Sequence, residues 1–375
     1  MIREQPHSHI ENDPKYTGLN VNQGIEQLPS VSEDSVKRFL KNKKKRSLSV
    51  PQYVDGILNG DITILSQAVT LVESSKPDHQ EIAQEIIVRC LPFSGNSVRI
   101  GITGVPGVGK STFIEAMGKY ITSKGEKLAV LAIDPSSERT KGSILGDKTR
   151  MEDLSTDPNA YIRPSPSAGS LGGVARKTRE TIILCEAAGF NHIFIETVGV
   201  GQSETAVHSM VDFFLLLMLA GAGDELQGIK RGIMEMADAI TINKADGNNI
   251  EKAGLARIQY ANALHLFPAT ESGWNPKVLT CSAYLKTGIS EIWDTIGEYL
   301  AHVKNNNYFQ HRRNDQSKFW MYETINEQLR NDFYQNEQIK ELMEESERKV
   351  LKEEISSFVA AKKLLDYYNQ IRKNN

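Results

Sequence analysis

One stretch of the sequence has the residue types and the spacing that bind a chain of phosphates. It reads Gly-Val-Pro-Gly-Val-Gly-Lys-Ser-Thr, fits the pattern GxxxxGK[ST], and lies between an apolar run and a segment of helical spacing. Glycines let backbone N–H groups point at phosphate oxygens, and the helix that follows adds its dipole. We expect Lys110 to neutralise phosphate charge and Ser111 to bind Mg²⁺. The predicted phosphate-binding residues are Gly104, Val105, Pro106, Gly107, Val108, Gly109, Lys110, Ser111 and Thr112.

A second motif predicts which base is attached to those phosphates. Asn243-Lys244-Ala245-Asp246 follows a short apolar run and resembles the NKxD element of GTPases. The Asp246 carboxylate can accept hydrogen bonds from both N1–H and the exocyclic amine of guanine, whereas adenine offers no such pair of donors. An unpaired buried carboxylate is costly, so the motif favours GTP over ATP. The predicted base-binding residues are Asn243, Lys244, Asp246, Ser282 and Ala283, with Cys281 in the supporting loop or its strand and not a nucleophile.

Three carboxylates are placed to hold the cation that accompanies a nucleotide. Asp134 and Glu196 each end an apolar run, and Asp147 follows in Gly-Asp-Lys-Thr-Arg. The carboxyl ends of parallel strands meet at one crevice, where such sheets bind ligands. Mg²⁺ takes oxygen ligands and keeps several waters. We therefore predict a magnesium environment of Ser111, Asp134, Asp147 and Glu196, in which one or two of the acids bind directly or through water.

Two further segments could respond to the nucleotide. Glu196-x-x-Gly199 predicts a backbone N–H, that of Gly199, which contacts the γ-phosphate. The next position, where a Ras-type enzyme has its water-orienting glutamine, is Val200, so we expect slow intrinsic hydrolysis accelerated by a partner or by loop ordering. The glycine-rich, charged stretch 220–230 could bring Asp224 or Lys230 to the nucleotide or to a partner. The predicted catalytic residues are Lys110, Glu196, Asp224 and Lys230.

The elements that must position these residues alternate between strands and helices. This alternation predicts βαβ units and a mostly parallel sheet covered on both faces, an α/β fold. The phosphate-binding and NKxD motifs resemble those of P-loop NTPases and imply the Ras-like GTPase form of this fold. The predicted strands are 98–103, 128–133, 192–196, 213–219, 239–242 and 278–281. The predicted helices between them are 110–123, 173–188, 251–267 and 289–303.

The two ends of the chain have a different character. We predict a polar, disordered tail over 1–30, a helical segment over 31–95 with helices at 53–58, 62–72 and 79–90, a nucleotide-binding domain over 96–306, and a helical arm over 307–375. The arm is predicted to contain helices at 318–334 and 339–371. The second is long for one small domain, so it either packs across the main domain or pairs with another chain.

Composition excludes several classes of protein. The chain has 375 residues, with 44 Lys and Arg against 47 Asp and Glu, and a net charge of −3. This balance argues against a dedicated nucleic-acid binder, and no apolar run approaches the roughly 20 residues of a membrane span. The three cysteines lie far apart, so no disulfide framework is expected, and no Cys/His metal motif occurs. With a polar N-terminus that lacks a signal peptide, these features predict a cytoplasmic protein without membrane or nucleic-acid partners.

Together, the motifs resemble the MeaB/ArgK group of P-loop GTPases, chaperones of adenosylcobalamin-dependent methylmalonyl-CoA mutase. The matching stretches are GITGVPGVGKST, DPSS, GSILGDKTRM, RPSPS, LGGVARKTRE, ETVGVGQSE, AGAGDELQGIKRGIME and NKAD. They span Gly101 to Asp246, and GDKTRM, ETVGVGQSE and AGAGDELQGIK are the most specific. One departure is the stretch 138–141, Glu-Arg-Thr-Lys, where family members often have a small, glycine-richer sequence; it affects the expected shape of the first switch.

The resemblance implies a Mg²⁺-dependent GTPase that binds GTP and GDP, forms a homodimer through the C-terminal arm, and gates cobalamin loading while protecting or reactivating the mutase. Cobalamin would be encountered only through the partner enzyme. It also implies that Asp224 to Lys230 is a third switch, with Lys230 the leading residue. The sequence leaves three alternatives open: a chaperone of a different acyl-CoA mutase, a transport-linked protein kinase, and a switch or scaffold with negligible turnover.

Overall fold

The computed structural model describes residues 48–133, 151–164, 171–197, 203–221 and 231–374. The chain divides into two units, Met1–Leu48 and Ser49–Asn375, and the description that follows concerns the second. The predicted tail over 1–30 and the start of the predicted helical segment lie outside the described residues. None of the helices in these ranges is both long and apolar enough to cross a bilayer.

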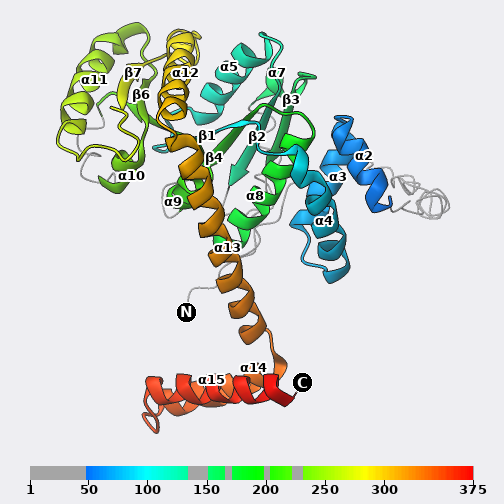
Figure 1. Ribbon diagram of the computed structural model, residues 1–375. Coiled ribbons are helices and arrows are strands. Elements are labelled where there is room, and N and C mark those ends of the chain that lie inside the picture. Colours follow the sequence, from blue (N-terminus) through cyan, green and yellow to red (C-terminus); the bar gives the residue numbers. More distant parts are fainter. Residues whose placement is uncertain (1–47, 134–150, 165–170, 198–202, 222–230, 375) are drawn as a thin grey trace, which may run out of the picture. The chain divides into compact units, whose positions relative to one another are not determined.

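A seven-stranded sheet, parallel throughout, forms the centre of the second unit and confirms the predicted α/β fold (Figure 1). Its strand order is β3-β2-β4-β1-β5-β6-β7. The strands are β1 (Val98–Gly104), β2 (Leu128–Ile133), β3 (Ala160–Pro164), β4 (His192–Thr197), β5 (Phe213–Leu219), β6 (Ala239–Asn243) and β7 (Lys277–Thr280). The sequence analysis missed β3 because this edge strand is short, carries an arginine and ends in proline.

Helices cover both faces of the sheet, as the buried, almost wholly apolar strands require (Figure 1). Helix α5 packs against α7 and α12 on one face, and α8 packs against α9 on the other; α10 also contacts α9. These helices are α5 (Lys110–Thr122), α7 (Glu152–Ser155), α8 (Leu171–Ala187), α9 (Ser203–His208), α10 (Arg231–Met236), α11 (Ile250–Leu264) and α12 (Ile289–Asn305). The four predicted helices of this region are confirmed, and the short helices α7, α9 and α10 were not predicted.

Among the described residues, which begin at 48, three helices precede the sheet where the sequence predicted them: α2 (Val50–Leu58), α3 (Ile62–Glu73) and α4 (Pro77–Cys90). The 3₁₀ turn η2 (Leu91–Phe93) follows them. Local chemistry fixes their starts. Asp61 accepts hydrogen bonds from the N–H groups of Thr63 and Ile64 at the start of α3, and α4 begins with a proline. Helices α3 and α4 both pack against α8, which links this layer to the sheet.

Three helices follow α12, and here the sequence-based boundaries were wrong. Helix α13 (Tyr308–Tyr334) begins ten residues before the predicted start, through a stretch too polar to give an apolar stripe. The predicted helix over 339–371 is two helices, α14 (Glu337–Leu351) and α15 (Ser357–Asn374), which pack against each other (Figure 1). The chain turns between them at Glu353, whose φ of 57° is left-handed, without the glycine or proline that would have revealed the turn.

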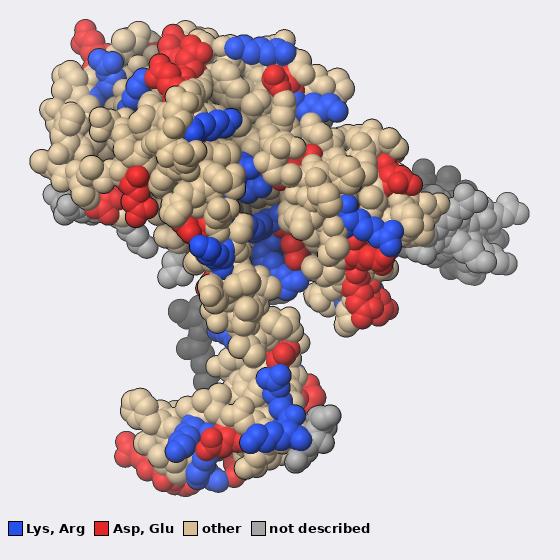
Figure 2. Space-filling view, in the orientation of Figure 1, with Lys and Arg blue, Asp and Glu red and all other residues tan. Residues whose placement is uncertain are grey.

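Charged residues of both signs are interspersed on the face seen in Figure 2. This pattern agrees with the near-neutral net charge of −3.

Candidate functional site

The glycine-rich loop joins the carboxyl end of β1 to α5, at the centre of the sheet. Its conformation explains its glycines. Gly107 and Gly109 have φ angles of 74° and 90°, in the left-handed region that favours glycine. A Cβ on Gly104 would lie 2.4 Å from the carbonyl oxygen of Leu217 in β5, so a side chain there would push the two strands apart. The predicted cradle residues Val105 and Val108 are buried, whereas Pro106, Gly107 and Thr112 are exposed, so the loop is anchored by its valines and open at its tip.

Lys110 lies in the first turn of α5, and its Nζ donates to the carbonyl oxygen of Gly104 at 3.0 Å, so the side chain folds back over the loop. Burial lowers the pKa of Lys110, while the carboxylates of Glu196 and Glu204 act in the opposite direction. Two acidic groups, from β4 and α9, therefore act electrostatically on the Lys110 ammonium.

The Asn-Lys-Ala-Asp motif leaves the carboxyl end of β6 and reaches the glycine-rich loop directly. Asn243, almost fully buried, donates from Nδ2 to the carbonyl oxygen of Val108 at 2.8 Å. Lys244, with a left-handed φ of 58°, donates from Nζ to the carbonyl oxygen of Gly107 at 2.8 Å. The predicted base-binding motif and the predicted phosphate cradle thus form one connected structure.

The loop after β7 closes the other side of this motif. The Oδ1 atom of Asn243 accepts from the Ala283 N–H at 3.1 Å, and the Ser282 hydroxyl donates to Asp246 Oδ2. Asp246 is only partly buried, so its carboxylate is held in place while remaining accessible. The structure brings together all five predicted base-binding residues.

Cys281 contributes more to this loop than the sequence suggested. Its thiol Sγ donates to Asn243 Oδ1 over 3.3 Å, and its carbonyl oxygen accepts from the Ala245 N–H at 2.9 Å. Burial raises the pKa of this thiol to about 12, so it stays protonated and remains a donor.

Glu196 is buried near the carboxyl end of β4, the strand between β1 and β2, and pairs in register with Ile102 and Ala132. The next residue, Thr197, donates its hydroxyl hydrogen to Thr103 Oγ1 at 2.8 Å and so ties β4 to β1 beside the cradle. The carboxylate of Glu196 and the hydroxyl of Ser111 in the first turn of α5 are hard oxygen donors. This donor chemistry fits a small divalent cation such as Mg²⁺.

Several predicted site residues cannot be placed. Asp134, Asp147, Gly199, Asp224 and Lys230 lie outside the described residues. Three strands end before three of them: β2 at Ile133, one residue before Asp134; β4 at Thr197, two before Gly199; and β5 at Leu219, five before Asp224. Each of these strands ends at the edge of the sheet that carries the glycine-rich loop. Within the described ranges, no three His, Cys, Asp or Glu side chains gather as a metal cluster.

One charged residue near the site was missed by sequence reasoning. Glu204 is almost fully buried in α9 and acts electrostatically on Lys110. It is one of several acids in the sequence around ETVGVGQSE, and no spacing rule distinguishes it. Its position follows from the path of α9 back toward β1, which α9 contacts.

Comparison with known proteins agrees with this geometry. The family model described as "Methylmalonyl Co-A mutase-associated GTPase MeaB" matches residues 65–338. The chain belongs to the MeaB family of GTPases. A probable GTPase of Mycobacterium bovis is 50% identical over 84% of this chain and 95% of its own length. The GTPase ArgK of Escherichia coli is 49% identical over 74% of this chain and 84% of its own length.

Two further relatives extend the comparison. The mouse protein named methylmalonic aciduria type A homolog, mitochondrial, is 45% identical over 87% of this chain and 80% of its own length. A crystal structure described as the LAO/AO transport system kinase is 37% identical, has a TM-score of 0.69, and covers 86% of this chain and 98% of that one. The protein is therefore a GTP hydrolase with the P-loop fold.

Proposed function

We propose that this GTPase is a chaperone of an adenosylcobalamin-dependent methylmalonyl-CoA mutase, gating cofactor loading and protecting or reactivating the mutase. The observation that carries the proposal is the family match, whose description names association with that mutase. The name of the mouse relative, which refers to methylmalonic aciduria, supports the same client. Cobalamin would then belong to the partner enzyme, and the output of GTP hydrolysis would be a conformational signal.

The hydrolytic step, attack of water on the γ-phosphate, is proposed to depend on positioning and charge neutralisation. Lys110, now folded onto Gly104, would turn to the phosphates, and the backbone N–H groups of the loop would hold their oxygens. Ser111, Glu196, Asp134 and Asp147 are proposed to hold Mg²⁺, which when bound would neutralise charge on the phosphates. Asp246 would select guanine, and the Gly199 N–H would contact the γ-phosphate.

Client control is proposed to act through the segment 222–230, which follows β5. Asp224 and Lys230 are the proposed contacts, and the resemblance to the family's third switch supports this role. Lys230→Ala is expected to bind GTP normally and to lose most of the client-stimulated increase in turnover. If the client stimulates the variant as strongly as it stimulates the wild type, Lys230 does not mediate client control.

The decisive experiment is GTP turnover by the full chain with and without the methylmalonyl-CoA mutase of the same organism. We expect a slow basal rate that rises at least tenfold with the mutase. A basal rate that the mutase leaves unchanged would refute the proposed client. Another acyl-CoA mutase in the same assay tests a different client, and transfer of labelled γ-phosphate to a protein would indicate a kinase.

The C-terminal arm, residues 307–375, is proposed to join two copies of the chain, beside a GTPase domain over 96–306 and a helical segment over 31–95. Large apolar side chains exposed on the arm support this role, because each copy could cover those of the other. Phe358 on α15 is 86% exposed, and Leu351 at the end of α14 is 84% exposed. Others are Phe319, Met321, Tyr322, Ile325, Leu329, Val359 and Leu365.

Light scattering on full-length variants tests the homodimer. Replacing both Phe358 and Leu365 with Glu is expected to give monomers, because two charges would be buried in an apolar contact. The matched control, Lys363→Glu, lies on the same helix but away from the face of Phe358 and Leu365, and should remain a dimer. A dimer that survives the double substitution would contradict the proposed interface.

A further inference from the structure

Helix α9 lies between the glycine-rich loop and the connection to β5 that the arm helix α13 contacts. At its start, Glu204 acts electrostatically on Lys110 in the phosphate cradle. At its end, His208 leads into residues 209–212, a short connection to β5 in which Met210 and Val211 are fully buried. Whatever holds this connection therefore also fixes where α9 places Glu204.

Helix α13, the first helix of the arm, holds four of the five residues 208–212. Arg312 donates to His208 Nε2 over 3.1 Å, and the Trp320 indole donates to the Ser209 carbonyl oxygen at 3.1 Å. The remaining contacts are Gln316 Nε2 to the Val211 carbonyl oxygen at 2.8 Å, and Arg313 to both carboxylate oxygens of Asp212 at 2.9 and 2.8 Å. Residues 312, 313, 316 and 320 share one face of the helix.

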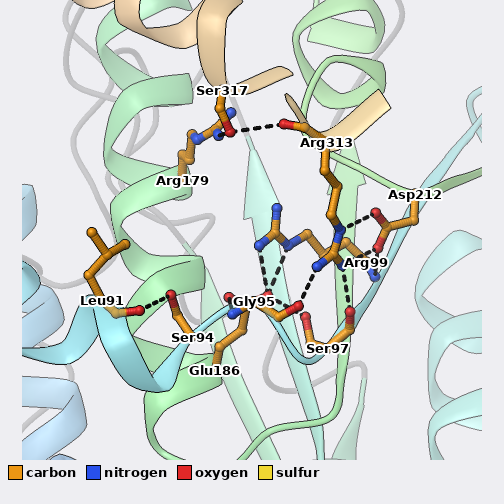
Figure 3. Close-up of polar contacts among 10 residues, drawn as sticks. All are labelled: Leu91, Ser94, Gly95, Ser97, Arg99, Arg179, Glu186, Asp212, Arg313 and Ser317. Atoms are coloured by element: carbon orange, nitrogen blue, oxygen red, sulfur yellow. Dashed lines mark hydrogen bonds and ion pairs between the residues drawn. The ribbon is translucent and has the colours of Figure 1, made fainter. Parts of the chain in front are cut away.

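These contacts are buried and specific. Burial and the neighbouring Arg312 lower the pKa of His208 to about 3, so the ring is neutral and can accept the arginine's hydrogen bond. Figure 3 shows Arg313 reaching Asp212 and the backbone of Ser97, just before β1. Asp212 Oδ2 also accepts from the Arg99 N–H at 2.8 Å. Helix α13 is therefore tied to β1 and β5 as well as to α9.

We infer that Arg312, Arg313, Gln316 and Trp320 are positioning residues for GTP hydrolysis. They fix the 208–212 connection, and through α9 they set the position of Glu204, the buried carboxylate that acts electrostatically on Lys110. An event on the arm, the binding of a second copy or of a client, would then change turnover through this contact. The inference rests on the proposed function for its partners, but the contact itself can be tested on the protein alone.

The first test uses the full chain labelled with 5-fluorotryptophan. The chain has three tryptophans, Trp274, Trp293 and Trp320, which give three ¹⁹F resonances; Trp320→Phe assigns one of them. We expect the Trp320 resonance to shift between GDP and a non-hydrolysable GTP analogue. Trp293, which makes an edge-to-face contact with His192 at the start of β4, serves as the internal reference. An unchanged Trp320 resonance in a protein that binds both nucleotides would refute the inference.

The second test separates positioning from stability. Trp320→Phe keeps an aromatic ring but removes the N–H donor, and is expected to lower the turnover number for GTP at least threefold while GDP affinity changes less than twofold. Lys318→Ala, an exposed residue of the same helix, should change neither quantity. Unchanged turnover in Trp320→Phe, or a parallel loss of turnover, GDP affinity and folded fraction, would overturn the inference.

A double-mutant cycle tests the route through Glu204. If α13 acts through that carboxylate, Trp320→Phe should lower turnover much less in a Glu204→Gln background than in the wild type. Equal, additive effects would place the action of Trp320 elsewhere. A protein that binds neither GTP nor GDP would instead contradict the GTPase assignment, so the two failures are distinguishable.

Discussion

The carboxyl ends and the amino ends of the strands in the central sheet, called here the carboxyl edge and the amino edge, are held by different kinds of contact. At the carboxyl edge, Lys110, Asn243 and Lys244 donate to main-chain carbonyl groups of a glycine-rich loop. At the amino edge, charged side chains pair with each other: Arg313 with Asp212, and Arg99 with Glu186 at 2.8 Å (Figure 3). Both carboxylates of these pairs are almost fully buried.

The difference reflects what each edge must do. A lysine resting on a carbonyl oxygen can exchange that partner for a phosphate at little cost, because the hydrogen bond to a charged ligand is stronger. A buried ion pair has no such freedom, since removing one partner leaves an uncompensated charge. Substitutions at the carboxyl edge should therefore change ligand binding and turnover. Those at the amino edge should change folding stability, and should change turnover only where they loosen the contacts of α13 with residues 208–212.

Lys110→Ala is expected to give the largest functional effect. Without its charge the cradle loses its main side-chain contact with the phosphates, and GTP turnover should fall at least a hundredfold, while the urea midpoint stays within experimental error. Single-turnover hydrolysis and equilibrium unfolding measure the two quantities. A strong loss of folding stability in Lys110→Ala would contradict the prediction that substitutions at the carboxyl edge change turnover and leave stability unchanged.

Glu186→Gln is the matching change at the amino edge. It leaves Arg99 without its buried partner, and the free energy of unfolding should fall by about 3 kcal/mol. Glu186 also accepts hydrogen bonds from the Gly95 N–H and the Ser97 hydroxyl, which glutamine replaces only in part. Nucleotide affinity of the folded protein should change less than twofold; a large selective loss of GTP binding would contradict this prediction.

The amino edge should also carry a pH dependence, centred on Asp238. Burial raises the pKa of this carboxyl to about 6 from 3.8, although Arg312 and the Phe214 N–H act against the rise. The folded protein therefore binds a proton more tightly than the unfolded chain, so stability falls as pH rises from about 4 to 6. The loss should be about 2–3 kcal/mol.

Urea unfolding of the wild type and of Asp238→Asn, at several pH values from 4 to 7, isolates this contribution. Asparagine keeps an acceptor for the Phe214 N–H but does not titrate. The wild type should lose stability relative to the variant as the pH rises through this range. Parallel curves for the two proteins would contradict the raised pKa.

Substitution of Cys281 should give the smallest of these effects, a small loss of GTP affinity at the carboxyl edge. Cys281→Val removes the thiol donor to Asn243 while keeping a similar volume, and should weaken GTP binding about threefold, as expected for a weak hydrogen bond. Cys281→Ser keeps a donor and serves as the control, with affinity close to that of the wild type. Equal affinities for all three proteins would mean that the thiol does not position Asn243.

The carboxyl edge could be predicted from sequence because its chemistry is local. Gly104 to Thr112 and Asn243 to Asp246 are contiguous, and each follows an apolar run that ends at the same edge of a parallel sheet. Because each motif is contiguous and directly follows a strand, its position in the fold could be predicted from the sequence.

The amino edge could not be predicted, because its partners are distant in sequence. Arg313 and Asp212 are 101 positions apart, and Arg99 and Glu186 are 87 apart. Nothing in the polar stretch before Lys318 indicates that α13 starts at Tyr308, because its first turns are held by such pairs and not by an apolar stripe. The turn between α14 and α15 was missed for a related reason, since Glu353 adopts a left-handed φ without a glycine.

The measurement that tests the central claim most directly is the base preference of Asp246→Asn. Asparagine can donate to the carbonyl oxygen at position 2 of xanthine but can no longer accept both guanine hydrogen bonds. We predict that the variant loses at least a hundredfold in GTP affinity and binds xanthosine triphosphate more tightly than GTP, with ATP bound poorly by both proteins. An unchanged preference for GTP in the variant would show that Asp246 does not read the base, and would contradict the site described at the carboxyl edge.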